Sequence, residues 1–343
     1  MNLTLQLTHR QVATLRAATP LSYVFLRPDR SGVRLSATGD HSVHIVALGK
    51  IEGTARMELA DLAEAVRCAP EGFMVTDGIA HARGWSKPMM VTPCEYTVPA
   101  LPRTIRLRLP DEAATTMLAR VLPAMGSDDT RPALAALNFE RKGGVLTIEA
   151  TDGHRLHVAQ APSKGRDFDV VIPAKAAKLL ARLLGELVLR ATSAERAKQA
   201  VSIRRGRHRI DTADSFDMAY FDRAKVLPTT CSWEVKVDAE EFRDAVKYLA
   251  ARGSRSGGTK SPVIRMAFGG RGSLLVKGAD GKDIARPIAA TSLPMEVGIA
   301  AQSHYLLSAV GKTGEVTICF DGDMDPIRID HDGVTCVVMP CRM

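Results

Sequence analysis

The sequence predicts an α+β fold of three similar domains, each with two helices packed against antiparallel sheets. Its length of 343 residues is that of two or three ordinary domains. A short motif recurs about once per third of the chain, as LSATGD at 35–40, IEATDG at 148–153 and VKGADG at 276–281. Around each copy, two helical patterns stand among several strand-like segments with short connections. This arrangement is typical of antiparallel sheets and not of alternating βαβ units.

Each third is expected to contain a strand, a helix, several strands, a second helix and further strands. Apolar residues at helical spacing predict first helices at 8–18, 111–122 and 238–252, and second helices at 59–69, 174–184 and 301–310. Pro110 precedes two acidic residues, and Asp238 precedes Glu240 and Glu241. Acidic side chains are favoured at a helix N-terminus, so both positions predict helix starts. With Pro228 at the second junction, the expected domains are 1–105, 106–228 and 229–343.

The composition excludes several classes of protein. With 45% hydrophobic and 24% charged residues, the chain resembles an ordinary globular protein. Residues 1–15 alternate apolar and polar side chains, which predicts a strand instead of a signal peptide, and no apolar stretch reaches the length of a membrane span. The six cysteines include no CxxC pair, so neither a zinc knuckle nor a small disulfide scaffold is indicated. We therefore expect a cytoplasmic protein with reduced thiols, and no membrane partner, bound metal or cofactor.

The formal net charge of +8 is compatible with a polyanionic partner such as DNA, although many basic proteins bind none. Lys175, Lys178 and Arg182 fall on one face of the helix predicted at 174–184, opposite a face of leucines. A helix with this pattern can pack on its sheet and turn its cations towards phosphate. Weaker candidates for a DNA-facing role are Arg10, Arg16, Arg120, Arg243 and Lys247. A basic helix face is also commonly only a solvated face, so both interpretations stay open.

Other motifs favour a plain structural interpretation. Gly311-Lys312-Thr313 lacks the first glycine of a phosphate-binding loop, and the acidic segment 321–325 lacks the glycine of a calcium loop. The basic run 204–209 is interrupted by Gly206, so a hairpin with solvated arginines is favoured over a nucleic-acid patch. No nucleophile elbow and no catalytic cysteine signature occur, so the sequence nominates no enzyme activity.

Several segments of the middle and last thirds resemble one known family. They are residues 131–134, 138–139, 143–144, 146–148, 150–156 (ATDGHRL), 171–175 (VIPAK) and 337–343 (VVMPCRM). Together they resemble the bacterial replicative sliding clamp, the β subunit of DNA polymerase III holoenzyme. The first third resembles that family faintly, and the loop between its first helix and its motif is shortened. The sequence therefore looks like a divergent member of the family.

The resemblance implies a chain of three clamp domains that forms a half ring, and a homodimer of two such chains joined head to tail. Duplex DNA would pass through the hole, bound without regard to sequence, and helices would line it. A sliding clamp is not an enzyme. It is a processivity factor of DNA replication that tethers DNA polymerase and binds its clamp loader through short hydrophobic peptide motifs. By the same resemblance, Tyr248 and Leu249 contribute to the dimer interface.

The resemblance also implies a partner-peptide cleft between the second and third domains. Its residues are Thr151, Gly153, His154, Arg155, Leu156, Pro228, Val337, Val338, Met339, Pro340, Cys341, Arg342 and Met343. The two valines would also complete the last sheet, whereas the sulfur-containing side chains suit a surface that adapts to different partners. The alternative function is a peptide-binding adaptor that keeps the clamp fold and does not close into a ring.

Overall fold

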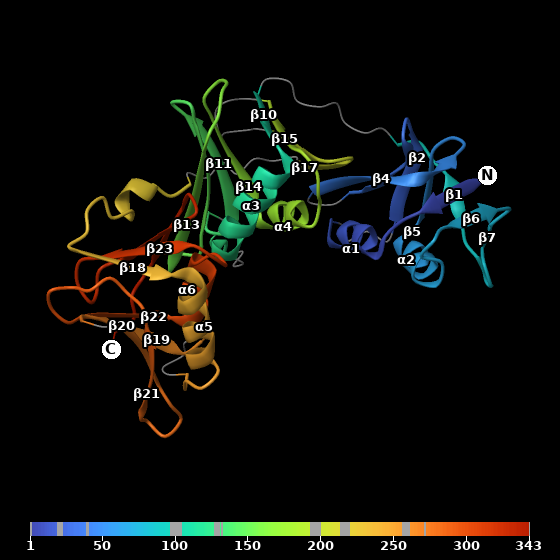
Figure 1. Ribbon diagram of the computed structural model, residues 1–343. Coiled ribbons are helices and arrows are strands. Elements are labelled where there is room, and N and C mark those ends of the chain that lie inside the picture. The colour runs from blue at the N-terminus through green and yellow to red at the C-terminus, as the bar shows by residue number, and fades with distance from the viewer. Residues whose placement is uncertain are drawn as a thin grey trace. The chain divides into compact units, whose positions relative to one another are not determined.

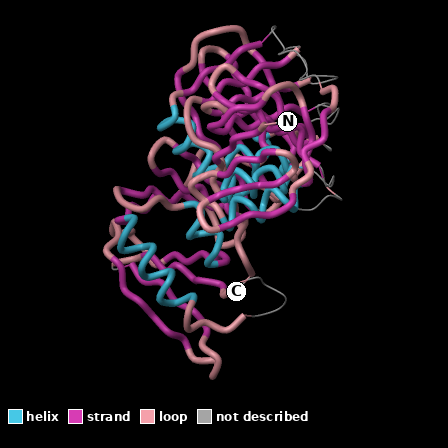
Figure 2. The backbone as a smooth tube through the Cα atoms, turned by 90° about the vertical axis from the view of Figure 1, so that its right-hand side faces the viewer, coloured by secondary structure: helices cyan, strands magenta, loops and turns pink. Residues whose placement is uncertain are grey.

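The structure, a computed structural model, describes residues 2–18, 23–38, 41–96, 105–126, 131, 133–192, 200–212, 220–255, 261–270 and 272–342. Strands make up most of the regular structure, and short helices stand between them (Figures 1 and 2). Within these residues, a strand, a helix, four strands, a second helix and further strands follow one another three times along the chain. This is the order of elements that the sequence predicts.

The first series consists of β1 (Leu3–Gln6), α1 (His9–Ala18), β2 (Tyr23–Asp29), β3 (Gly32–Ala37), β4 (His41–Ile51), β5 (Ala55–Glu58), α2 (Leu59–Cys68), β6 (Phe73–Thr76), β7 (Ile79–Ala82), β8 (Trp85–Pro88) and β9 (Val91–Pro93). The second consists of β10 (Ile105–Leu109), α3 (Asp111–Val121), the 3-10 helix η1 (Leu122–Ala124), β11 (Ala136–Lys142), β12 (Val145–Thr151), β13 (Arg155–Pro162), β14 (Phe168–Pro173), α4 (Ala174–Ala181), β15 (Leu187–Ala191), β16 (Val201–Arg205) and β17 (His208–Thr212). After the 3-10 helix η2 (Arg223–Lys225), the third consists of β18 (Trp233–Asp238), α5 (Ala239–Ala250), β19 (Val263–Phe268), β20 (Gly272–Lys277), β21 (Asp283–Ile288), β22 (Val297–Gln302), α6 (Ser303–Ala309), β23 (Glu315–Phe320), β24 (Ile327–His331) and β25 (Val334–Val338).

Two helix boundaries show what apolar spacing can and cannot locate. α5 begins where its acidic residues predict, because the Asp238 carboxylate accepts a hydrogen bond from Glu241 N at 2.9 Å. α4, predicted to reach residue 184, ends at Ala181. Leu183 is buried beyond the helix end, and Gly185 follows with a φ of 105°. The apolar pattern is therefore longer than the helix, because a residue after the helix also turns into the core.

The chain divides into two compact units, Met1–Thr115 with Gly165–Met218 and Thr116–Lys164 with Ala219–Met343. This division passes through the predicted middle domain. The domain boundaries at 105/106 and 228/229 therefore stay a prediction, and each unit is described separately.

In the first unit, thirteen strands form one sheet, whose main path runs β10-β15-β16-β17-β4-β1-β6-β7-β8. Every pair along this path is antiparallel. Side chains alternate between the two faces: Ile105, Leu107 and Leu109 are buried, whereas Arg106 and Arg108 between them are exposed. The expected antiparallel architecture is thus present.

In the second unit, β11-β12-β13-β25-β24-β23-β18 form one antiparallel series, and β21-β20-β19-β22 form a separate four-stranded sheet. α5 packs on the four-stranded sheet through its apolar face, where Phe242, Val246 and Leu249 are buried. β25 lies between β13 and β24, so the last strand joins residues that are far apart in the sequence. This pairing places the segment after β25 beside the turn between β12 and β13.

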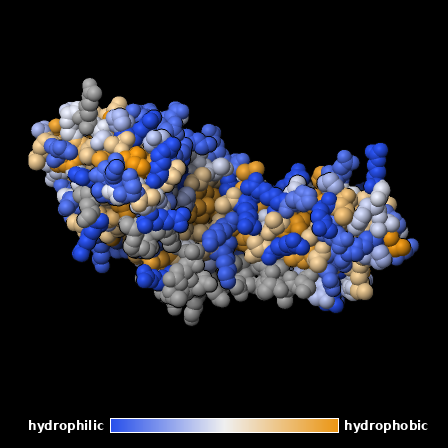
Figure 3. Space-filling model, turned by 90° about the horizontal axis from the view of Figure 1, so that it is seen from below, coloured by the Kyte–Doolittle hydropathy of each residue, from blue (hydrophilic) through white to orange (hydrophobic). Residues whose placement is uncertain are grey.

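The surface is mixed in character. Hydrophilic side chains are spread over the face that Figure 3 shows, with small hydrophobic patches between them. None of the described helices has the length and apolar character that a membrane crossing requires.

Candidate partner cleft and nucleic-acid interface

Residues 151–156 form the turn between β12 and β13 in the second unit. Thr151 Oγ1 accepts a hydrogen bond from Gly153 N at 3.1 Å and donates one to Arg155 O at 2.7 Å. Asp152 Oδ1 accepts hydrogen bonds from the backbone N–H groups of His154 and Arg155 at 3.0 and 3.1 Å. Gly153 has a φ of 87°, in the region that favours glycine. The local sequence TDGHR therefore specifies the turn, and the turn sets the direction of Arg155.

Arg155 connects this turn to two other elements. Its guanidinium contacts Asp152 Oδ2 at 3.1 Å and donates to Ser308 Oγ of α6 at 2.6 Å. It also donates to the carbonyl of Pro123 in η1, and it lies 4.8 Å from the centre of the Tyr305 ring. Because only 11% of its side chain is exposed, Arg155 acts as a fixed support for the turn.

The segment after β25 runs along the turn. Arg155 and Leu156 pair with Val338 and Val337, so both valines complete the sheet and are buried. Beyond them, Met339 N donates to His154 O at 2.9 Å. The Met339 side chain is 41% exposed, which leaves an apolar side chain at the surface beside His154.

The other predicted cleft residues of this segment differ in their surroundings. Cys341 donates its N–H to Ala300 O at 2.8 Å. Pro340 is half-buried, Arg342 is exposed, and Met343 lies outside the described residues.

An apolar cluster lies next to this segment. Its members are Leu156, Val158 and Val337, which are buried, with the partly buried Phe221, Val226 and Leu227 packed against them. The last three were not predicted as site residues, although their apolar side chains stand in the stretch FDRAKVLP that ends at Pro228. Residues that are apolar and only partly covered can accept apolar side chains of a partner.

Arg223 holds the stretch that carries Phe221, Val226 and Leu227. Its guanidinium pairs with Glu140 Oε2 at 2.6 Å and with Glu149 Oε1 at 3.3 Å. Burial raises the pKa of the Glu149 carboxyl, although Asn138 and Arg223 both favour its charged form. At the far end of the stretch, Pro228 O accepts a hydrogen bond from Arg328 at 3.0 Å.

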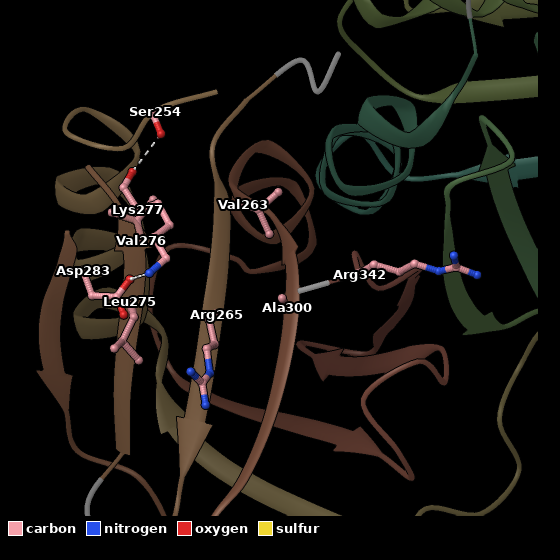
Figure 4. A pocket seen from close by; sticks show the side chains of 9 residues that line it. All are labelled: Ser254, Val263, Arg265, Leu275, Val276, Lys277, Asp283, Ala300 and Arg342. Atoms are coloured by element: carbon pink, nitrogen blue, oxygen red, sulfur yellow. Dashed lines mark hydrogen bonds and ion pairs between the residues drawn. The ribbon is translucent and has the colours of Figure 1, made fainter. Parts of the chain in front are cut away.

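A pocket of about 260 Å³ lies on the four-stranded sheet of the same unit (Figure 4). It is lined by Ser254, Val263, Arg265, Leu275, Val276, Lys277, Asp283, Ala300 and Arg342. Lys277 and Asp283 face each other at 2.9 Å, and the Arg342 side chain extends away from the strands. Most of these residues were not predicted, because they come from separate strands that only the sheet brings together.

In the first unit, α1 and α4 lie against each other; they carry four of the predicted DNA-facing residues, and a fifth, Arg182, directly follows α4. Arg10 donates to Ala181 O at 3.5 Å, and Arg182 donates to Ala13 O at 3.4 Å, so each arginine reaches a carbonyl of the other helix. The exposed cations of this surface are Arg10, Arg16, Lys175, Lys178 and Arg182. Neither helix contains an acidic residue. We call these five residues the basic helix pair.

The other three predicted DNA-facing residues lie in the second unit and have partners within it. Arg120 donates to Ala309 O at 2.8 Å and lies 3.1 Å from His331 Nδ1. Arg243 donates to the carbonyls of Leu307 and Val310 at 2.7 and 2.5 Å, at the end of α6. Lys247 pairs with Asp244 at 3.0 Å. Arg120 and Arg243 are only partly exposed, unlike the five cations of the basic helix pair, and the charge of Lys247 is paired with a carboxylate. We therefore leave these three residues out of the candidate interface.

The predicted dimer residues differ in exposure. Leu249 is fully buried in the core of its own unit, because it lies on the face of α5 that packs on the sheet. Tyr248 is 38% exposed, with the guanidinium of Arg252 at 3.7 Å from its ring centre and that of Arg286 at 5.2 Å. Only Tyr248 is therefore available at the surface.

The basic run 204–209 forms the predicted hairpin, with Gly206 in the turn between β16 and β17. The expectation that all its arginines are solvated is wrong. Arg205 is 2% exposed and contacts Asp111 at 3.3 Å, and Arg209 pairs with Asp211 at 2.6 Å. Alternation along the strands turns Arg205 inward, where its charge needs these partners.

The sequence similarity of the chain lies with one family. Residues 108–203 match the family described as DNA polymerase III beta subunit, central domain. Curated relatives with the name Beta sliding clamp include that of Halalkalibacterium halodurans, 35% identical over 100 residues, and that of Bacillus subtilis, 23% identical over 256 residues. By sequence, the chain is similar to a divergent bacterial sliding clamp. The matches cover 27% and 69% of this chain, and 26% and 64% of those two clamps.

Solved clamp structures share the fold over the whole chain. The DNA polymerase sliding clamp from Bacillus subtilis has a TM-score of 0.83 at 19% identity, covering 100% of this chain and 99% of that one. The DNA polymerase III subunit beta from Pseudomonas aeruginosa has a TM-score of 0.81 at 20% identity, with 100% of both chains covered. The predicted family and the predicted clamp fold are thus confirmed, while the individual site residues stay predictions.

Proposed function

We propose that the chain is a DNA sliding clamp, a processivity factor that encircles duplex DNA and tethers a replicative polymerase. The observation that carries the proposal is the basic helix pair: five exposed cations on, or directly after, two adjoining helices that have no acidic residue. Phosphate contacts of this kind bind duplex without reading its sequence. A small number of contacts also suits a protein that must move along DNA and is retained by topology.

The proposed partner site is the apolar cluster together with Met339 and the turn at 151–156. Met339 is exposed beside His154, and its flexible thioether can adjust to different apolar side chains. Arg155 fixes the turn at 151–156, and Arg223 fixes the stretch that carries Phe221, Val226 and Leu227, each through a buried or partly buried ion pair. We infer that a polymerase or a clamp loader inserts a short hydrophobic peptide here, and that the chain itself catalyses no reaction.

We further propose a head-to-tail homodimer. β21 is the last strand of its four-stranded sheet, and β8 is the last strand of the sheet in the first unit. Open strand edges favour pairing with another chain, so each unit offers an edge that a second copy could cover. Tyr248 lies beside Arg286 of β21 and would contribute to the contact.

Mass in solution and retention on DNA test this function together. Light scattering should give twice the chain mass of 37.0 kDa at micromolar concentration. After loading by a bacterial clamp loader and ATP, the protein should remain on nicked circular duplex and be lost when that duplex is cut. A monomeric mass with equal retention on circular and linear DNA would instead favour the clamp-fold adaptor that does not form a ring.

A further inference from the structure

β18 and β23 are neighbouring strands of the second unit (Figure 1). Two cysteines and a glutamate meet at one end of this pair. The Sγ atoms of Cys231 and Cys319 and a carboxylate oxygen of Glu234 all lie within 4.8 Å of one another. Both cysteines are free thiols. Neither thiol is used by the proposed clamp function.

Strand pairing explains why these residues meet. Glu234 of β18 is directly opposite Cys319 of β23, and side chains of directly opposite residues share one face of a sheet. Cys231 stands just before β18, next to Ser232, whose backbone N–H and hydroxyl donate to Asp321 Oδ1 at 2.6 and 2.7 Å. The site is therefore built by a contact between residues far apart in the sequence, which explains why cysteine spacing did not predict it.

The spacing fits a small metal ion. In a tetrahedral zinc site with Zn–S bonds of about 2.3 Å, neighbouring sulfur ligands are about 3.8 Å apart. The three candidate ligand atoms lie within 4.8 Å of one another, which is close to that separation. Cys319 is buried, Cys231 is half-buried and Glu234 is exposed, so an ion would enter from the solvent side and keep one position for water.

One guanidinium orients the Cys319 sulfur. Arg328 Nη2 donates to Cys319 Sγ at 3.6 Å, and the same guanidinium is fixed by Asp330 at 2.8 Å and by Pro228 O at 3.0 Å. A positive donor fixed in this way orients the sulfur, as groups around metal ligands commonly do. Burial and the neighbouring Cys231 nevertheless raise the pKa of the Cys319 thiol to about 12, so an ion that binds here must displace the thiol proton.

We propose that Cys231, Glu234 and Cys319 form a binding site for one divalent ion of the zinc class. Two sulfur ligands favour zinc over magnesium or calcium, which prefer oxygen. A bound ion would fix the segment between Pro228 and β18 onto β23. It would bind independently of DNA and of partner peptides.

The test uses the full chain, reduced and freed of metal with a chelator. Isothermal titration with Zn²⁺ should give one ion per chain, and Co²⁺ should give thiolate-to-cobalt charge-transfer absorption. Loss of an outer-shell partner alone lowers metal affinity by about 10–100-fold, so Cys231→Ser should lower zinc affinity by at least about a hundredfold. Glu234→Gln should lower it less, because both thiolates remain.

The matched control is Cys68→Ser, which removes an exposed cysteine outside the site and should bind zinc as the parent does. Because Cys319 is buried, the substitution is made at the half-buried Cys231. Circular dichroism checks that the Cys231→Ser variant is folded. The proposal is overturned if the parent binds no zinc, if Cys231→Ser binds it unchanged, or if Cys68→Ser loses binding to the same degree.

Discussion

Neutralising α4 should change how the binding of DNA depends on salt. The variant Lys175→Gln, Lys178→Gln, Arg182→Gln removes three of the five cations of the basic helix pair. It leaves the apolar face of α4, and therefore its packing, in place. If the basic helix pair is the DNA interface, the variant should bind duplex more weakly and with a smaller salt dependence.

The size of the effect follows from the number of cations. Each phosphate contact on duplex DNA contributes about −0.9 to the slope of log K against log salt concentration. Five contacts give a slope of about −4.5 for the parent, and two contacts give about −1.8 for the variant. Between 50 and 200 mM salt, affinity should therefore fall about 500-fold for the parent and about 12-fold for the variant.

Fluorescence anisotropy with a short linear duplex measures these slopes without a clamp loader. The matched control is Arg106→Gln, Arg108→Gln, Arg204→Gln, which removes the same number of charges from exposed arginines on β10 and β16 of the same unit. The control should keep the slope of the parent. Circular dichroism confirms that both variants are folded.

Two results would refute the reasoning. An unchanged slope in the α4 variant would mean that these residues do not contact phosphate. A slope that falls equally in the control would mean that binding follows the overall charge and not the surface formed by α1 and α4.

Three further predictions concern the second unit. Arg155→Ala should lower the free energy of unfolding by about 2–4 kcal/mol in urea, because it leaves Asp152 and Ser308 without their charged partner, and Arg155→Lys should restore less than half of the loss. Deletion of residues 339–343 should abolish binding of a clamp-binding peptide in calorimetry while the dimer mass persists; unchanged binding would place the partner site elsewhere. Burial lowers the pKa of His157 to about 4, so between pH 6.5 and 4 the unfolded chain takes up a proton that the folded chain does not. Stability should therefore be complete above pH 6.5 and fall by about 3 kcal/mol towards pH 4, and urea unfolding of His157→Gln should lack this part of the pH dependence.

Much of the candidate site could be predicted from the sequence. The turn at 151–156 is specified by its own residues, and helical spacing alone places Lys175 and Lys178 of α4 on one face. The stretch before Pro228 could have been noticed from its apolar residues, but its contact with Val337 could not. That contact depends on the pairing of β13 with β25, and the sequence of neither strand alone predicts the register between strands that are distant in the chain.

By itself, the sequence determined the threefold order of elements, the helix starts and the family. These features depend on short-range spacing, capping residues and local turns, whose energetics involve neighbours along the chain. Only the tertiary structure decided which charges are available. It engaged Arg120 and Arg243 with carbonyls at the end of α6, buried Leu249, and brought Cys231 to Cys319. The physical reason is that the segment packed against a side chain decides whether that side chain is buried and which charge it pairs with. The apolar periodicity of a helix or strand shows which of its faces is buried, but not which segment packs against that face.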